Sequence, residues 1–248
     1  MYGDASINLS GSISAGDIGG DLTLVTEADQ TISDAITLNG SGAALISIIA
    51  EKGAILTVQV AFTTNAGAIT LSAEDDAIFS AAGDLTSTKG NISVSADDDA
   101  TSDAASGGAL TMVDGAVFNA DSGTVTVSAD ENITTGQITT TNSSSSAIQL
   151  SSVSGNLVDG DTDGSNDLIA TNGTVFIADA ELFGLSTNAI EVSASATNTS
   201  GLTAVVVTST ADATLGGSGE TIGDASVGQT VSIASGIDKS VSKTILSP

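Results

Sequence analysis

One short pattern recurs along most of the chain and limits the folds that the chain can adopt. A glycine is followed by apolar residues at the second and fourth positions after it, by a small residue at the sixth and by an acid at the seventh. The clearest copies are GDLTLVTE from Gly20, GAITLSAE from Gly67, GNISVSAD from Gly90 and GTVTVSAD from Gly123. Apolar residues that alternate after a turn residue predict a short β-strand with one buried face.

The spacing of these copies indicates how the strands are arranged. The four clear copies start 47, 23 and 33 residues apart, and the first step is close to two units because GAALISII lies within it as a degenerate copy. Weaker copies follow from Ser146, Gly173 and Asn188. A unit in the low twenties is too long for a hairpin and too short for a βαβ unit, but it suits one coil of a parallel β-helix. We therefore expect an all-β solenoid of about nine or ten coils, which stack at roughly 4.8 Å.

Tandem β-sandwich domains are the alternative fold, because they also consist of short strands separated by turn residues. The chain has no tryptophan or cysteine that could mark the core of an immunoglobulin-like domain. A single motif with constant internal spacing favours the solenoid.

Composition excludes several classes of function. The chain has 30 acidic residues and four lysines among 248 residues, a formal net charge of -26, and no arginine, histidine or cysteine. Nucleic-acid binding needs clustered cations, and an anionic membrane surface would repel the chain, so we expect neither a nucleic acid partner nor membrane insertion. The usual catalytic base, the thiol nucleophile and the cysteine and histidine ligands of zinc are absent. Carboxylates and carbonyls remain, and they suit calcium or magnesium.

The runs GAITLSAEDDAIFSAAGDLTSTKGNISVSADDD and ADAELFGLSTNAIEVSASATNTSGLTAVVVTSTADATLG resemble the repeats of giant bacterial surface proteins of the filamentous haemagglutinin type. The resemblance covers about residues 20–216. It implies a right-handed parallel β-helix, export to the cell surface, and adhesion or a structural stalk. The partners would be a host or neighbouring cell, a surface polysaccharide and adjacent repeat modules. We expect residues 20–216 to form the module, 1–19 its N-terminal edge or the end of a preceding module, and 217–248 a last coil or linker.

The stretch LVDGDTDGSNDLIA, residues 157–170, is the best candidate for a binding site. Its acids have the spacing of the first nine positions of an EF-hand-like loop, and the candidate calcium ligands are Asp159, Asp161, Asp163, Ser165 through its carbonyl, and Asp167. The twelfth position is Ala170, where such a loop carries a bidentate glutamate, so calcium would be held weakly. We expect a surface loop inserted between two coils. An acidic turn without an ion is the alternative.

Two further features bear on function. The acids at the seventh position, Glu27, Glu74, Asp97 and Asp130, would stack at one turn of successive coils, as solvated turns or as weak cation sites. The outward residues Thr23, Thr70, Ser93 and Thr126 would form a row of hydroxyls. Such rows occur in ice-binding β-helices, but the paired rank one position after the glycine is missing from most copies.

We expect a structural module and not an enzyme. Two carboxylates suffice for glycoside hydrolysis, so a carbohydrate-active β-helix enzyme, a hydrolase or a polysaccharide lyase, is an alternative function. However, the chain has no tryptophan to form a sugar platform and no arginine to act as the base of a lyase.

Overall fold

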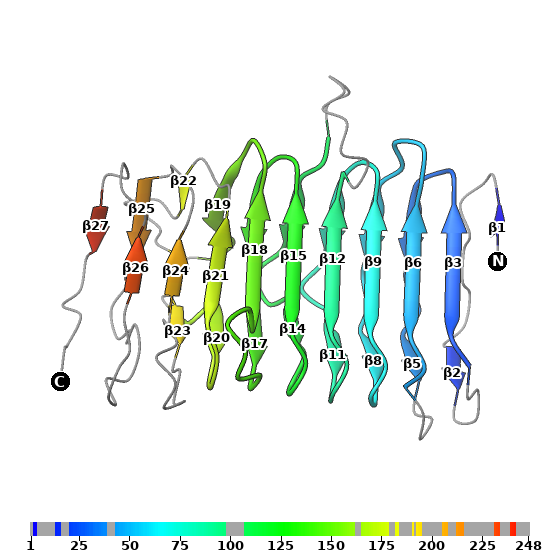
Figure 1. Cartoon of the computed structure of the whole chain (residues 1–248). Coiled ribbons are helices and arrows are strands. Elements are labelled where there is room, and N and C mark those ends of the chain that lie inside the picture. Colours follow the sequence, from blue (N-terminus) through cyan, green and yellow to red (C-terminus); the bar gives the residue numbers. More distant parts are fainter. Residues whose placement is uncertain are drawn as a thin grey trace.

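The computed structural model describes residues 2–3, 13–15, 20–38, 43–97, 107–161, 165–178, 182–183, 190, 192–194, 205–207, 212–215, 231–233 and 239–241. All regular elements in these ranges are strands, and every strand pair is parallel. The strands form three long sheets that run side by side along one axis (Figure 1). The all-β parallel β-helix expected from the repeat is confirmed, and the β-sandwich alternative is wrong.

The first sheet contains the repeated motif. Its ten strands, in spatial order, are β1 (Tyr2–Gly3), β3 (Leu22–Thr26), β6 (Ile46–Ala50), β9 (Ile69–Ala73), β12 (Ile92–Ala96), β15 (Val125–Ala129), β18 (Ile148–Ser152), β21 (Val175–Ala178), β24 (Val205–Val207) and β26 (Val231–Ile233). The degenerate copy forms β6, which pairs with β3 on one side and with β9 on the other. The first long step of the repeat therefore spans two coils, as expected.

Two further sheets complete each coil with shorter strands. The second sheet contains β4 (Gln30–Ile32), β7 (Leu56–Val58), β10 (Ala77–Phe79), β13 (Leu110–Met112), β16 (Ile133–Thr135), β19 (Asn156–Asp159), β22 (Leu182–Phe183), β25 (Asp212–Leu215) and β27 (Lys239–Val241). The third sheet contains β2 (Ile13–Ala15), β5 (Ile36–Leu38), β8 (Phe62–Thr64), β11 (Leu85–Ser87), β14 (Val117–Asn119), β17 (Gln137–Thr140), β20 (Leu168–Ala170) and β23 (Val192–Ala194).

Six consecutive coils, from β3 to β20, have one strand in each sheet and described side chains. This is fewer than the nine or ten coils expected, although the strands before β3 and after β20 extend the same sheets. We call the turn after a first-sheet strand the first corner, the turn after a second-sheet strand the second corner, and the turn that returns to the first sheet the third corner.

Inward side chains of the three sheets fill the interior of the solenoid. The strands alternate between buried and more exposed residues, for example Ile92, Val94 and Ala96 inward on β12. The rings of Phe79 on β10 and Phe118 on β14 pack edge to face across the interior, with their centroids 4.8 Å apart. Burial of this continuous apolar column is the main stabilising term of the fold.

The repeat glycines lie at the third corner, where successive coils approach one another most closely. A Cβ atom on Gly90 would lie 2.0 Å from the carbonyl oxygen of Gly67, and one on Gly123 would lie 2.1 Å from the carbonyl oxygen of Gly90. The buried hydroxyls of Thr64 and Ser87 donate to the same Gly67 carbonyl, at 2.6 and 3.0 Å. The glycine of the motif is therefore required by close approach of two backbones.

Candidate functional site

The acidic stretch lies at the second corner of the sixth coil. Asn156–Asp159 forms β19 and Leu168–Ala170 forms β20, so the loop lies within one coil. We had expected it between two coils, and that prediction is wrong. Leu157 and Leu168 are fully buried and continue the core columns above and below them. The difference arises because each flanking strand is too short for its alternation to be recognised beside the aspartates.

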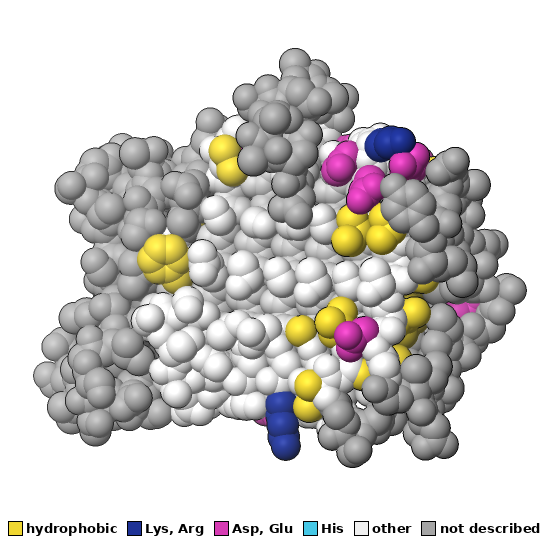
Figure 2. Space-filling view, turned by 45° about the vertical axis from the view of Figure 1, so that its right-hand side comes forward, with side chains coloured by type: hydrophobic (Ala, Val, Ile, Leu, Met, Phe, Trp, Pro, Cys, Tyr) yellow, Lys and Arg dark blue, Asp and Glu magenta, His cyan; other side chains and the backbone are white. Residues whose placement is uncertain are grey.

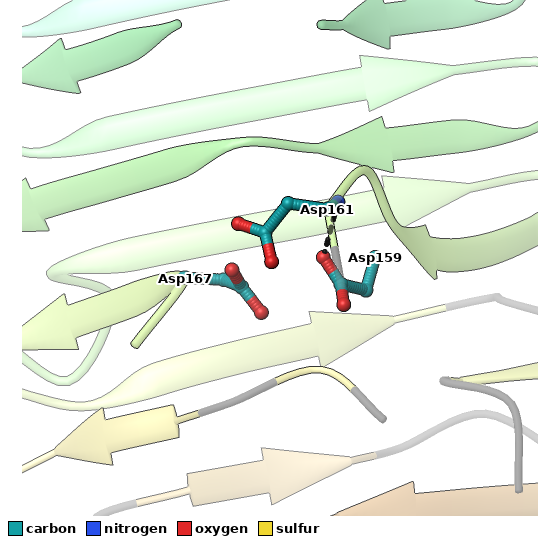
Figure 3. Close-up of side chains that lie close together, drawn as sticks. All are labelled: Asp159, Asp161 and Asp167. Atoms are coloured by element: carbon teal, nitrogen blue, oxygen red, sulfur yellow. Dashed lines mark hydrogen bonds between the residues drawn. The ribbon is translucent and has the colours of Figure 1, made fainter. Parts of the chain in front are cut away.

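Three of the candidate ligands come together. Asp159, Asp161 and Asp167 each direct a carboxylate oxygen into one small region, and these oxygens all lie within 4.8 Å of one another (Figure 3). The Asp161 N–H donates to Asp159 Oδ1 at 2.8 Å, which holds the chain in a tight turn after β19. The sequence therefore predicted three residues of this cluster correctly.

The cluster is more enclosed than a surface loop would be. The Asp159 side chain points inward at the end of β19 and is 9% exposed, while Asp167 is 1% exposed. Asp159 lies opposite Thr135 of the preceding coil, so the inward column, which holds Phe79 and Met112 in earlier coils, becomes polar here. Buried carboxylates that face one another are unfavourable unless a proton or a cation intervenes.

The remaining predicted ligand positions are not among the three carboxylates of this cluster. Asp163 lies outside the described residues. Ser165 is described, and its side chain is exposed. Ala170 ends β20 and is fully buried in the core, so the twelfth position of the loop belongs to a strand and supplies no oxygen ligand from its side chain.

Carboxylate oxygens within 4.8 Å of one another can share one calcium ion. Calcium binds oxygen at about 2.3–2.6 Å, so two of its ligands can lie up to about 5 Å apart. Magnesium binds at about 2.1 Å, which brings its ligands within about 4.2 Å of one another. Three carboxylates would provide half of the smallest calcium coordination shell, and backbone carbonyls or water would complete it.

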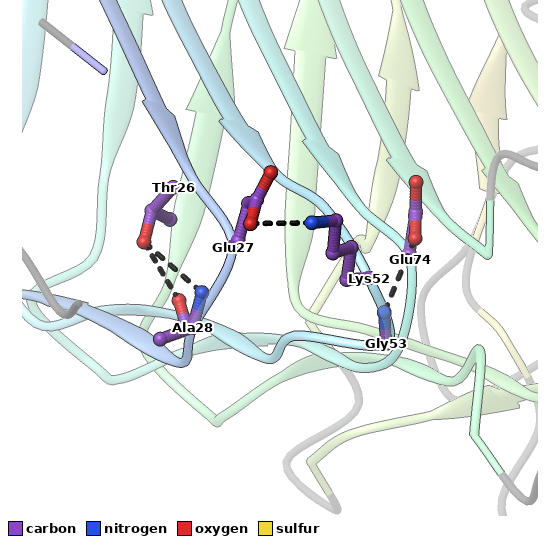
Figure 4. Close-up of polar contacts among 6 residues, drawn as sticks. All are labelled: Thr26, Glu27, Ala28, Lys52, Gly53 and Glu74. Carbon is purple, nitrogen blue, oxygen red and sulfur yellow. Dashed lines mark hydrogen bonds and ion pairs between the residues drawn. The ribbon is translucent and has the colours of Figure 1, made fainter. Parts of the chain in front are cut away.

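The acids of the seventh motif position form a column at the first corner, as expected. The register of the first sheet places Glu27, Glu51, Glu74, Asp97 and Asp130 at equivalent positions of five successive coils. Glu51 belongs to the degenerate copy and was missed. Lys52 Nζ lies 2.5 Å from Glu27 Oε2, and Glu74 Oε2 accepts the Gly53 N–H at 3.1 Å (Figure 4). A lysine and a backbone N–H therefore contact two of these acids, so the column is not simply a row of solvated carboxylates.

A second set of acids and asparagines, which the sequence did not distinguish, joins neighbouring coils. Each residue of the set precedes a strand, and its side-chain oxygen accepts the backbone N–H of the residue opposite to it in the next coil. The six pairs are Asp21 with Leu45, Asp29 with Ile55, Asp76 with Ala109, Asp84 with Val117, Asn91 with Thr124 and Asn132 with Asn156. We call them Asx staples. They satisfy backbone N–H groups at the strand starts.

The outward face of the first sheet carries two rows of hydroxyls. Thr23, Thr70, Ser93 and Thr126 share one row with Ser47, as the motif predicts. Two residues further along the strands, Ser72, Ser95, Ser128 and Ser151 form a second row. The prediction missed it because the second rank was sought one position after the glycine, which lies before the first row.

Charge is segregated from the sheets. Within the six coils from β3 to β20, Asp159 is the one charged residue in a strand, and its side chain points inward. The remaining described charges of these coils lie at the corners, and the sheet face in Figure 2 is correspondingly covered by uncharged side chains.

Comparisons with protein-family models, with curated proteins and with solved structures found no match to this chain. The described residues contain no helix with the length and hydropathy that a bilayer crossing requires.

Proposed function

We propose that this chain is a non-enzymatic structural and adhesion module of a large, repetitive, extracellular bacterial surface protein. The carrying observation is the uninterrupted parallel pairing of six coils, with a filled apolar interior and an uncharged outer surface on every sheet. A solenoid of this kind can be extended by further coils and presents the same surface at each coil. Each coil needs only its neighbours for stability. The proposed surface location and the proposed class of partner rest on the motif resemblance described above.

Burial of the carboxylate cluster also favours a structural role. A glycosidase uses two carboxyl groups that flank a sugar bond and contact it directly. Asp167 is 1% exposed and Asp159 is 9% exposed, so neither presents its carboxylate to a bound polysaccharide. Incubation with a panel of polysaccharides is expected to release neither reducing ends nor unsaturated sugars, and release of either product would favour the enzyme alternative.

The surface location can be tested on the cells that produce the protein. Intact cells are treated briefly with an external protease, and the released peptides are compared with those from lysed cells. Peptides from residues 20–178 are expected in the intact-cell sample, with cleavage at exposed corner residues such as Lys52 and Lys89. Their appearance only after lysis, while a known surface protein is cleaved in both samples, would contradict the proposal.

Calcium binding at Asp159, Asp161 and Asp167 is the second part of the proposal. The observation that favours it is the convergence of three carboxylates, two of them in buried residues, whose oxygens lie within 4.8 Å of one another. A bound ion would tie the end of β19 to the start of β20 and so stiffen one coil. At 100 times its dissociation constant, calcium would add about 2.7 kcal/mol to the free energy of unfolding.

The calcium site is tested by thermal unfolding at constant ionic strength, with chelator, calcium or magnesium. The wild-type midpoint is expected to rise with calcium and to rise less with magnesium. Asp167→Asn should lose this rise, and in chelator it should melt above the wild type because one of three repelling charges is gone. Asp114→Asn removes an exposed charge from the second corner of another coil and should behave as the wild type. A wild-type midpoint that calcium leaves unchanged would rule out the site.

A further inference from the structure

We propose that Asp75 and Asp76 form a carboxylate latch that fastens the backbone of residues 107–109, just before β13, and that the latch holds more tightly in mild acid than at neutral pH. The latch is defined as these two side chains together with the backbone of residues 107–109. It lies at the first corner, away from the candidate calcium site.

The latch lies where the repeat is longest. Ile92 of β12 lies opposite Val125 of β15, so this coil has more residues than its neighbours, whereas its strands keep their register with the coils on both sides. Asp97 follows β12, and Gly107 and Gly108 precede β13. All three have positive φ angles, of 52°, 152° and 94°, a conformation that glycine adopts readily.

Two neighbouring carboxylates contact the backbone of residues 107–109. Asp76 Oδ1 accepts the Ala109 N–H at 2.9 Å, which is one of the Asx staples. Asp75 adds a contact that the other staples do not have, because its carboxylate lies close enough to the Gly108 N–H to interact with it. The carboxylate also lies against Gly107, where a Cβ atom would come within 1.7 Å of Asp75 Oδ1. The glycine at position 107 thus allows Asp75 to close over the backbone.

The latch is surrounded by other acids. A Cβ atom on Gly108 would lie 2.6 Å from the Cβ of Asp97 and 3.3 Å from that of Asp130, so the next two coils also bring carboxylates to this corner. The described titratable and charged groups of this corner in successive coils are Glu27, Asp29, Glu51, Lys52, Glu74, Asp75, Asp76, Asp97, Asp130 and Glu131. Lys52 is the one cation among these described groups, and it pairs with Glu27.

This environment disfavours the charged form of Asp75. Partial burial raises the pKa of the Asp75 carboxyl above its ordinary value, and the negative charges of Asp76 and Asp29 raise it further. The N–H groups of Asp76 and Gly108 lower it by a smaller amount. A carboxyl with a raised pKa in the folded state stabilises the fold most at a pH below its ordinary pKa. That stabilisation is lost as the pH rises through the raised value.

The latch is tested by amide hydrogen exchange of Gly108 and Ala109, measured residue by residue from about pH 4 to pH 7 and expressed as protection factors. In the wild type, protection is expected to fall as the pH rises, by about tenfold for each unit by which the pKa of Asp75 is raised. In Asp75→Asn, which keeps the acceptor oxygen but not the charge, protection should be nearly independent of pH and exceed that of the wild type at pH 7.

Three comparisons make this test decisive. Asp114→Asn removes the same charge at another corner and should keep the wild-type pH profile. Gly107→Ala should lower protection at Gly108 at every pH, because the new Cβ displaces the Asp75 carboxylate. Carbon NMR titration of the Asp75 carboxyl in the wild type requires no variant. Protection at Gly108 that does not change with pH, or an Asp75 titration midpoint at or below the ordinary value, would overturn the proposal.

Discussion

Glycines of the third corner determine how closely two coils can stack. Gly67, Gly90 and Gly123 each place the Cα where a Cβ would penetrate the backbone of the preceding coil. The sequence identified these glycines as strand starts from their spacing. It could not show why glycine is needed, because the partner backbone of Gly90 lies 23 residues earlier in the chain and contacts it only after both coils form.

Substitution of a single repeat glycine tests this explanation. Gly90→Ala should lower the free energy of unfolding by about 1–3 kcal/mol, because the Gly67 carbonyl must move to admit a methyl group. Urea denaturation measures the change. Gly53→Asn is the control, since nothing lies within 4 Å of its Cβ position and asparagine tolerates the positive φ of 71°. A larger loss in Gly53→Asn than in Gly90→Ala would refute the close-approach explanation.

Acids of the corners show what a sequence conceals at the residue level. Glu27 and Asp29 are both acidic and lie two residues apart, but Glu27 pairs with Lys52 and Asp29 accepts the Ile55 N–H. Their different roles depend on residues more than twenty positions away. The calcium candidates Asp159, Asp161 and Asp167 were found because their convergence depends mainly on local spacing.

At the scale of elements, strand length decided what could be predicted. First-sheet strands of the six coils have five residues and were recognised from alternation. Second- and third-sheet strands such as β10 and β11 have three residues, with one buried, one partly exposed and one buried position. Three residues do not define a period, so one strand of each coil was predicted and the other two were not.

The inward orientation of such a short strand can be tested on β10. Phe79→Ala should lower the free energy of unfolding by about 3–5 kcal/mol, because it opens a cavity beside Phe118. Ile78→Ala removes a side chain of similar hydrophobicity from the outward face of the same strand and should cost much less. Equal losses in thermal or urea unfolding would show that β10 does not present Phe79 to the core.

For the whole molecule, net charge opposes the compact state. The 30 acids and four lysines are brought closer together by folding, so their mutual repulsion is stronger in the folded than in the unfolded chain. Raising sodium chloride from about 0.01 M to about 0.15 M shortens the screening length from about 30 Å to about 8 Å. The unfolding midpoint should therefore rise, and potassium chloride should raise it equally. A midpoint that falls with salt would contradict this account.

The Asx staples also carry a genetic consequence. Each staple links a coil to the next through a side chain that precedes a strand, and in the second sheet the acceptor recurs in every second coil, at Asp29, Asp76 and Asn132. Duplication or deletion of the codons of two adjacent coils would therefore keep an acceptor opposite a backbone N–H at the new junction of that sheet. Recombination between such repeats would change the length of the solenoid in steps of two coils.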